Sequence, residues 1–138
     1  MSFFGGIKRT LGDAAFSDYV RSLAGWVCEW PGCGRDFTNN HQGLHCSHFH
    51  TRANPRVRFD LSNTSALCAY HHDYVGKHPH EHVEYFKQRL GALEYDMLTV
   101  RANSRRKERL DHKFEAIRWR KALEDLEKGK PEVLGAKA

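Results

Sequence analysis

Two short pairs of metal-ligand residues constrain the fold of this chain most tightly. Four residues separate Cys28 from Cys33, and two separate Cys68 from His71. Structural zinc is tetrahedral and is commonly bound by cysteine and histidine ligands supplied as two closely spaced pairs. Such pairs must meet in space, and in a small domain the metal-binding energy contributes directly to folding. We therefore predict a structural zinc site with the ligands Cys28, Cys33, Cys68 and His71.

Cys46 leaves an alternative open for this site, because it could replace His71 as the fourth ligand or face the core as an inert thiol. We favour the inert thiol. The sequence has no recognisable secretion signal, so metal binding is favoured over disulfide formation. It has no apolar run of membrane-spanning length either, and we expect a cytoplasmic protein.

The hydrophobic pattern predicts an α+β fold. Residues 44–50 and 56–61 are predicted as two strands, joined by a polar linker that contains Pro55. A capping-type sequence, Asn63-Thr64-Ser65, precedes a helix predicted from Ala66 to about Tyr74. Two strands followed by a helix make a ββα unit.

Further helices are predicted on both sides of this unit. They cover residues 13–24, residues 79–90 with Gly91 as the C-cap, a stretch from about Ala92, and residues 104–128. The predicted organisation is an N-terminal helical segment (1–25), a ββα core with the zinc site (26–78), a long basic helical extension (79–128) and a flexible tail (129–138).

Side chains around the ββα unit suit the hydrolysis of a phosphodiester bond. A histidine of near-neutral pKa can take a proton from water, and His48 at the end of the first strand is our candidate base. His72 lies about 100° round its helix from His71, so it can point away from the zinc and bind a catalytic divalent ion. Asn63 could orient His48 or fasten the inter-strand loop. Taken alone it could equally be a helix cap, but together with His48 and His72 it favours a functional role.

These residues resemble a known family. The segments SHFHTR, RVRFDLSNTSALCAYHH, GKHP and YFKQRLG are similar to phage recombination nucleases of the NinG/Rap type, within the HNH (His-Me finger, ββα-metal) endonucleases. The resemblance covers about residues 28–98. It implies a zinc-stabilised ββα-metal core with His48 as general base, Asn63 as the structural asparagine and His72 as a ligand of catalytic Mg²⁺ or Mn²⁺. It also implies cleavage of branched DNA such as Holliday junctions and D-loops, in the host cytoplasm if the chain is phage-encoded.

The chain departs from this pattern at the second ligand of the catalytic ion. Many HNH proteins have an aspartate immediately before the base, where this chain has Ser47. NinG-type sequences have an acidic residue three positions before the base, where this chain has His45. Either His45 completes the ion's shell, or phosphate oxygens and water do.

Charge favours a nucleic-acid partner, because the net charge is +5 and the isoelectric point is about 9.1. Arg52 could clamp the scissile phosphate, with Arg56 and Arg58 beside it. The densest basic run contains Arg105, Arg106 and Lys107, which we predict to contact the DNA backbone; a solvated basic surface is the alternative. A homodimer stays open, and we predict that His78, His80 and His82 lie in an exposed polar turn.

Two other functions fit parts of this pattern. A non-catalytic zinc-finger DNA-binding protein would need the zinc site and the basic segments but not His48 or His72. An HNH nuclease of phage packaging or defence would act on duplex DNA instead of junctions. Nuclease activity on plasmid DNA separates the first from our prediction, and a comparison of substrates separates the second.

Overall fold

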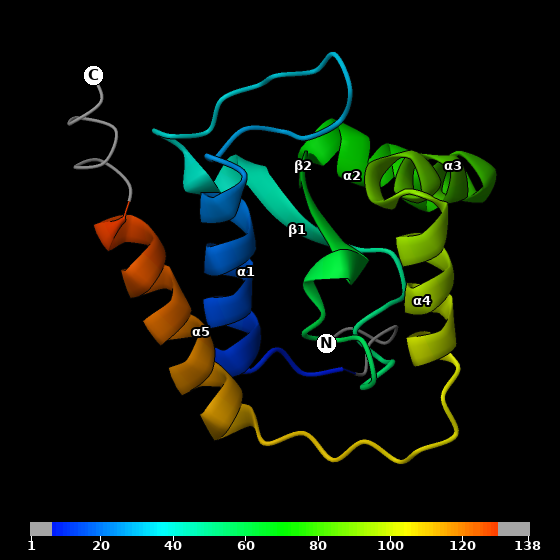
Figure 1. The fold of residues 1–138 in the computed structure, drawn as a ribbon. Helices are drawn as coiled ribbons and strands as arrows, with labels where there is room; N and C mark the ends of the chain where they lie inside the picture. The colour runs from blue at the N-terminus through cyan, green and yellow to red at the C-terminus, as the bar shows by residue number, and fades with distance from the viewer. Residues whose placement is uncertain (1–6, 130–138) are drawn as a thin grey trace.

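The computed structural model describes residues 7–129, which form five α-helices and one two-stranded antiparallel sheet. The α+β prediction is therefore confirmed. The elements are α1 (Leu11–Leu23), β1 (Leu44–His48), β2 (Thr64–Cys68), α2 (Ala69–Lys77), α3 (Pro79–Leu90), α4 (Ala92–Ala102) and α5 (His112–Lys128). The sheet lies between the α1–α5 pair and the group α2, α3 and α4 (Figure 1). The predicted tail, apart from Gly129, lies outside the described residues, as do residues 1–6 of the predicted N-terminal segment.

The chain contains the predicted ββα unit, but its second strand is not the predicted one. β1 pairs with β2 so that Leu44 lies opposite Cys68 and His48 opposite Thr64, and α2 follows directly. The predicted strand 56–61 forms turns instead. Its alternating pattern arises because Val57 and Phe59 are buried in two different hydrophobic clusters. All five residues of β2 are buried, so this strand lacks the alternation that marks a half-exposed strand.

The last helix is shorter than predicted, because it begins eight residues later. Residues 103–111 are irregular, and α5 begins at His112 behind Asp111, whose side chain accepts a hydrogen bond from the Phe114 N–H. α5 packs along α1 (Figure 1). Gly12 permits this approach, because a Cβ atom there would lie 3.1 Å from the Cβ of Glu115.

The other predicted helices are present with shifted ends. The largest shift is in the helix predicted from Ala66 behind Asn63-Thr64-Ser65, because residues 64–68 form β2 and α2 begins at Ala69. α1 begins two residues before the predicted start, behind Thr10, which forms a capping box with Asp13. α3 carries Pro79 in its first turn and is followed by Gly91, whose φ of 84° lies in the region that favours glycine. Among residues 7–129, no helix combines the length and apolar character that crossing a membrane requires.

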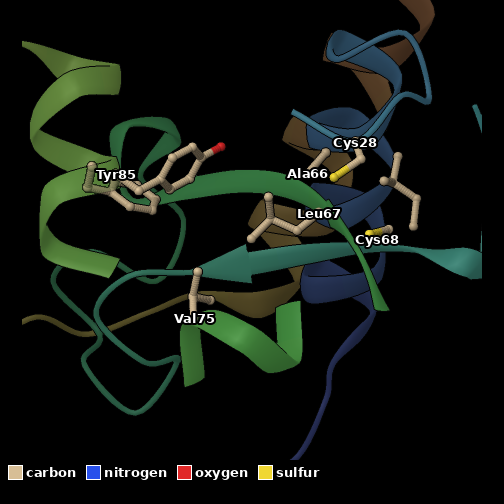
Figure 2. Packing of buried hydrophobic residues seen from close by; sticks show 8 residues of the cluster. Cys28, Ala66, Leu67, Cys68, Val75 and Tyr85 are labelled. Atoms are coloured by element: carbon tan, nitrogen blue, oxygen red, sulfur yellow. The ribbon is translucent and has the colours of Figure 1, made fainter. Parts of the chain in front are cut away.

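Two hydrophobic clusters hold the ββα unit from opposite sides. The first joins β2 to α2 and α3 through buried residues that include Leu67, Val75 and Tyr85 (Figure 2). The second joins α1, α5 and the loop before β2 through Phe16, Phe59 and Trp119, with the rings of Phe16 and Trp119 4.8 Å apart. β1 and β2 therefore have a fixed position between two helical layers.

Candidate metal centre and active-site cleft

The four predicted zinc ligands meet at one end of the sheet. The sulfurs of Cys28, Cys33 and Cys68 and the imidazole of His71 place one ligand atom each within 4.8 Å of all the others. His71 Nδ1 lies 3.3 Å from Cys68 Sγ and 3.8 Å from Cys28 Sγ. No other group of three or more histidine, cysteine or acidic side chains within residues 7–129 meets the same distance condition.

The donor set fits a tetrahedral metal ion. Zinc–sulfur bonds of about 2.3 Å in a tetrahedron place neighbouring ligand atoms roughly 3.8 Å apart, close to the spacing observed. Trp30 stacks on His71 at 5.1 Å and covers one face of its ring. The cluster could therefore hold a metal such as zinc, and its four protein ligands leave no coordination position for a substrate.

Local structure explains why these ligands converge. The Cys28 N–H donates a hydrogen bond to the Arg35 carbonyl, which closes the turn of residues 28–35 that contains the first two cysteines. Gly32 and Gly34 adopt positive φ angles within this turn. Cys68 is the last residue of β2 and precedes α2, so His71 in the first turn of α2 faces back toward it. Burial raises the pKa of the Cys28 thiol to about 11, and metal binding would displace that proton.

Cys46 does not belong to this cluster. It packs against the hydrophobic residues shared by α1 and α5, and burial raises the pKa of its thiol to about 12. Of the two alternatives for Cys46, the structure therefore supports the inert thiol, and His71 stays in the ligand set.

A cleft of about 700 Å³ opens between α1, β1 and the first turn of α2. Its charged and titratable lining is predominantly basic. These lining residues are Arg9, Asp13, Arg21, His45, Cys46, His48, Arg52 and His72. Three arginines beside one carboxylate give the cleft a positive potential that suits a phosphate group.

His48 occupies one wall of this cleft with a defined hydrogen bond. Its Nε2 atom lies 2.9 Å from the main-chain carbonyl oxygen of Arg58. Because a carbonyl only accepts, Nε2 carries the proton in the neutral ring and the free lone pair lies on Nδ1. Burial lowers the pKa of His48 below its usual 6.5, so the ring is neutral at pH 7 and able to accept a proton.

Asn63 fastens the inter-strand connection (residues 49–63) and caps no helix. The residue is fully buried. Its Oδ1 accepts a hydrogen bond from the His50 N–H at 2.8 Å, and its Nδ2 donates to the carbonyls of His50 and Val57 at 2.8 and 3.1 Å. The structure therefore favours the interpretation of Asn63 as a residue that fastens the inter-strand loop over its interpretation as a helix cap. The connection that it fastens leaves β1 directly after His48.

His45 and His72 come together across the cleft from different elements. Their rings stack nearly parallel, with centroids 5.0 Å apart. Partial desolvation and the neighbouring imidazole lower the pKa of His72. Ser47 is 1% exposed and is not among the residues that line the cleft. Of the two candidates for a second ion ligand, His45 is therefore the one beside His72.

The basic residues predicted to contact DNA lie in different surroundings. Arg52 lines the cleft as expected. Arg58 does not face the surface, because its guanidinium is buried against Asp13 at 2.6 Å, and it is withdrawn from the DNA-contacting set. Arg56 lies beside a second depression near Trp119, away from the cleft. Arg105, Arg106 and Lys107 are exposed in the irregular segment before α5.

The prediction of an exposed histidine turn is wrong for His82. Its ring is half-buried beside Phe49 and Phe86, and burial lowers its pKa to about 4. Within the described residues, the Nε2 atoms of His82 and His50 are buried without a hydrogen-bond partner. His80 is exposed, as predicted, and so is His78, whose Nδ1 contacts the Tyr74 carbonyl.

Sequence reasoning missed the contribution of α1 to the cleft. Arg9, Asp13 and Arg21 lie far from the ββα unit in sequence, and helical periodicity alone indicates α1. The aspartate three residues after Thr10 was the available signal, but it indicates a capping box and no more. Comparison with protein-family models, curated proteins and solved structures finds no match to this chain.

Proposed function

We propose that this chain is a metal-dependent DNA endonuclease of the HNH type. The observation that carries the proposal is the basic cleft beside β1. His48, which has a free lone pair on Nδ1, lines this cleft together with Arg52 and the stacked pair His45 and His72. Phosphodiester hydrolysis needs a proton acceptor for the attacking water and positive charge at the phosphate; His48 can supply the first, and Arg52 with an ion held by His45 and His72 can supply the second.

In this proposal His48 accepts the proton of a water molecule at Nδ1. The water oxygen forms a bond to the phosphorus as the bond to the 3′-oxygen breaks. Arg52 binds a non-bridging oxygen of the phosphate and offsets the charge that builds up there. The Arg58 carbonyl holds the neutral His48 ring in the Nε2–H tautomer, which leaves the lone pair on Nδ1 to accept the proton; Nε2 still donates to this carbonyl from the imidazolium that forms.

His45 and His72 would hold the catalytic ion, with phosphate oxygens and water completing its shell. When bound, a divalent ion supplies charge stabilisation for the transition state and for the leaving oxygen. Mg²⁺ prefers oxygen ligands in a near-ideal octahedron, whereas imidazole nitrogens favour transition-metal ions. Of the two expected ions, Mn²⁺ should therefore support faster cleavage than Mg²⁺.

Structure-selective cleavage of branched DNA is the finer form of this proposal. It comes from the resemblance of residues 28–98 to NinG/Rap-type nucleases, and the basic cleft and the exposed run at 105–107 are compatible with it. Cleavage of a linear duplex, a D-loop and a four-way junction in one assay tests it. Equal rates on all three would favour the duplex nuclease of packaging or defence.

The test of nuclease activity compares His48→Ala with His80→Ala on supercoiled plasmid in Mn²⁺. His48→Ala should lower the nicking rate by about 10²- to 10⁴-fold, the usual contribution of a general base. His80 is an exposed histidine outside the cleft, so its variant should cut at the wild-type rate. Binding of DNA without nicking by the wild-type chain, in either metal, would favour the non-catalytic zinc-finger alternative.

A further inference from the structure

A buried carboxylate on α1, that of Asp13, contacts two arginines beside the cleft, Arg52 and Arg58. Asp13 is 5% exposed and accepts two hydrogen bonds from Arg58, from Nε to Oδ1 at 3.0 Å and from Nη2 to Oδ2 at 2.6 Å. Nη1 of Arg52 lies 3.1 Å from the same Oδ2. One carboxylate thus hydrogen-bonds one arginine of the inter-strand connection and forms an ion pair, without a hydrogen bond, with a second.

The carboxylate is itself held in one orientation. The Thr10 N–H donates to its Oδ2 at 2.8 Å as part of the capping box that starts α1. Burial alone would raise the pKa of Asp13, but the hydrogen bonds from Arg58 and Thr10 hold it at about 2. Asp13 is therefore ionised at neutral pH and remains paired with both guanidinium groups.

The same arginine that Asp13 clamps also orients the candidate base. The main-chain carbonyl of Arg58 accepts the hydrogen bond from His48 Nε2 at 2.9 Å. A base is effective only when its tautomer and ring plane are fixed, and a carbonyl on a fastened segment fixes both. Arg52, the other partner of Asp13, lines the cleft beside His48.

We propose that Asp13 is a positioning residue of the active site: through Arg58 it fixes the tautomer of His48, and through Arg52 it sets the arginine that receives the phosphate. The proposal rests on the proposed nuclease function. It gives α1, which lies outside the ββα unit, an indirect part in the chemistry of that unit, through the two arginines that Asp13 contacts. It also explains why an ion pair is buried here, although such pairs seldom add much stability.

A purely structural role for this ion pair is the competing explanation, and Glu115 provides the matched control. Glu115 is also a buried carboxylate; it accepts a hydrogen bond from Trp119 Nε1 at 3.0 Å and lies outside the cleft. Asp13→Asn and Glu115→Gln remove the same charge from similar burial. Both should lower the melting temperature, but only Asp13→Asn should change the chemistry.

The first arm of the test measures plasmid cleavage in Mn²⁺ by the full chain. Asp13→Asn should lower kcat by about 10- to 100-fold, the usual loss when a group that orients a site residue is removed, with a smaller change in KM. Glu115→Gln should retain the wild-type kcat. Equal kcat values for Asp13→Asn and the wild type would overturn the proposal.

The second arm reads His48 directly by nitrogen-15 NMR of the ring and needs no nuclease activity. The wild type and Glu115→Gln should show the Nε2–H tautomer alone, whereas Asp13→Asn should show a mixture of the two. A single Nε2–H tautomer in Asp13→Asn would reduce Asp13 to a structural role. If the wild type cut no DNA, the proposed function would fail, and this arm would still decide whether Asp13 positions His48.

A second variant covers the case in which Asp13→Asn does not fold because it leaves Arg58 buried and unpaired. Asp13→Asn combined with Arg58→Met removes both charges and keeps the main-chain carbonyl of residue 58. This variant should melt near the wild-type temperature and still show mixed tautomers and a reduced kcat. Wild-type values of both would overturn the proposal.

Discussion

The Cys3His cluster and the basic cleft lie on the same ββα unit but are held together by different means. The cluster gathers four ligand atoms within 4.8 Å, under a stacked tryptophan, and leaves no position for a substrate. The cleft is open, and its side chains are held by hydrogen bonds and ion pairs from α1 and from the inter-strand connection. Adjacent residues on α2, His71 and His72, belong to different sites. A metal can therefore stabilise the scaffold while the neighbouring side chain stays available for chemistry.

The largest effect should follow loss of a cluster ligand. Cys68→Ala should abolish metal binding and leave the chain unfolded, because a structural zinc site contributes about 10 kcal/mol or more to the folding of a small domain. Far-ultraviolet circular dichroism and zinc content measured on the same sample check this. Cys46→Ala, a cysteine outside the cluster, should keep both its zinc and its fold. A folded, metal-free Cys68→Ala protein would show that the cluster region, like the cleft, does not depend on metal for its structure.

The second-largest loss of stability should follow from substitution of Asn63, which fastens the inter-strand connection beside the cleft by hydrogen bonds and not through a metal. Asn63→Ala removes three side-chain hydrogen bonds and leaves buried main-chain groups unpaired, so the free energy of unfolding should fall by about 3 kcal/mol. Urea denaturation measures the change, with zinc content as a second readout that should stay unchanged. Asn39→Ala, in an exposed turn residue, should cost less than about 0.5 kcal/mol. Zinc loss in the Asn63 variant would mean that the two regions are not independent.

The pH dependence of stability should show how much the Asp13 carboxylate on α1 contributes to holding the cleft. The pKa of Asp13 is lowered from 3.8 to about 2 on folding, so the carboxylate adds stability above pH 4 and loses it as the pH falls toward 2. The loss should be about 2 kcal/mol for a shift of this size. Urea midpoints between pH 5 and pH 2 report it for the wild type and for Asp13→Asn combined with Arg58→Met. The same acid-induced loss in both proteins would assign it to other carboxylates.

The smallest effect should follow from the exposed basic run outside both regions. Replacing Arg105, Arg106 and Lys107 by alanine should reduce the slope of log affinity against log salt by up to about 3, because each phosphate contact releases about one counterion. Fluorescence anisotropy with labelled duplex DNA at several salt concentrations measures the slope. The kcat for cleavage should stay at the wild-type value. An unchanged slope would leave this segment as a solvated surface.

Ligand spacing predicted the zinc cluster well because it depends on local sequence. Cys28 and Cys33 lie in one turn, and Cys68 and His71 span the start of one helix, so each pair is visible in a few residues. The roles of His48 and His72 were assigned from the order of residues in the same way, and they stay predictions.

The features that were not predicted correctly depend on contacts between residues distant in sequence. The second strand was misplaced because β2 is covered on both faces and carries no alternation, whereas Val57 and Phe59 alternate only because they enter different clusters. The contact of Asp13 with Arg58 joins residues far apart along the chain, and no local sequence pattern predicts it. Arg58 looked exposed for the same reason.

The central claim is that His71 and His72, neighbours in sequence, serve two different metal sites, and metal binding by matched alanine variants tests it most directly. Zinc retained after dialysis and the affinity for added Mn²⁺ would be measured for the wild type, His71→Ala and His72→Ala. His71→Ala should lose zinc and stability. His72→Ala should retain its zinc and its melting temperature but bind Mn²⁺ at least about 10-fold more weakly. Loss of zinc from His72→Ala, or wild-type Mn²⁺ affinity in it, would contradict the account.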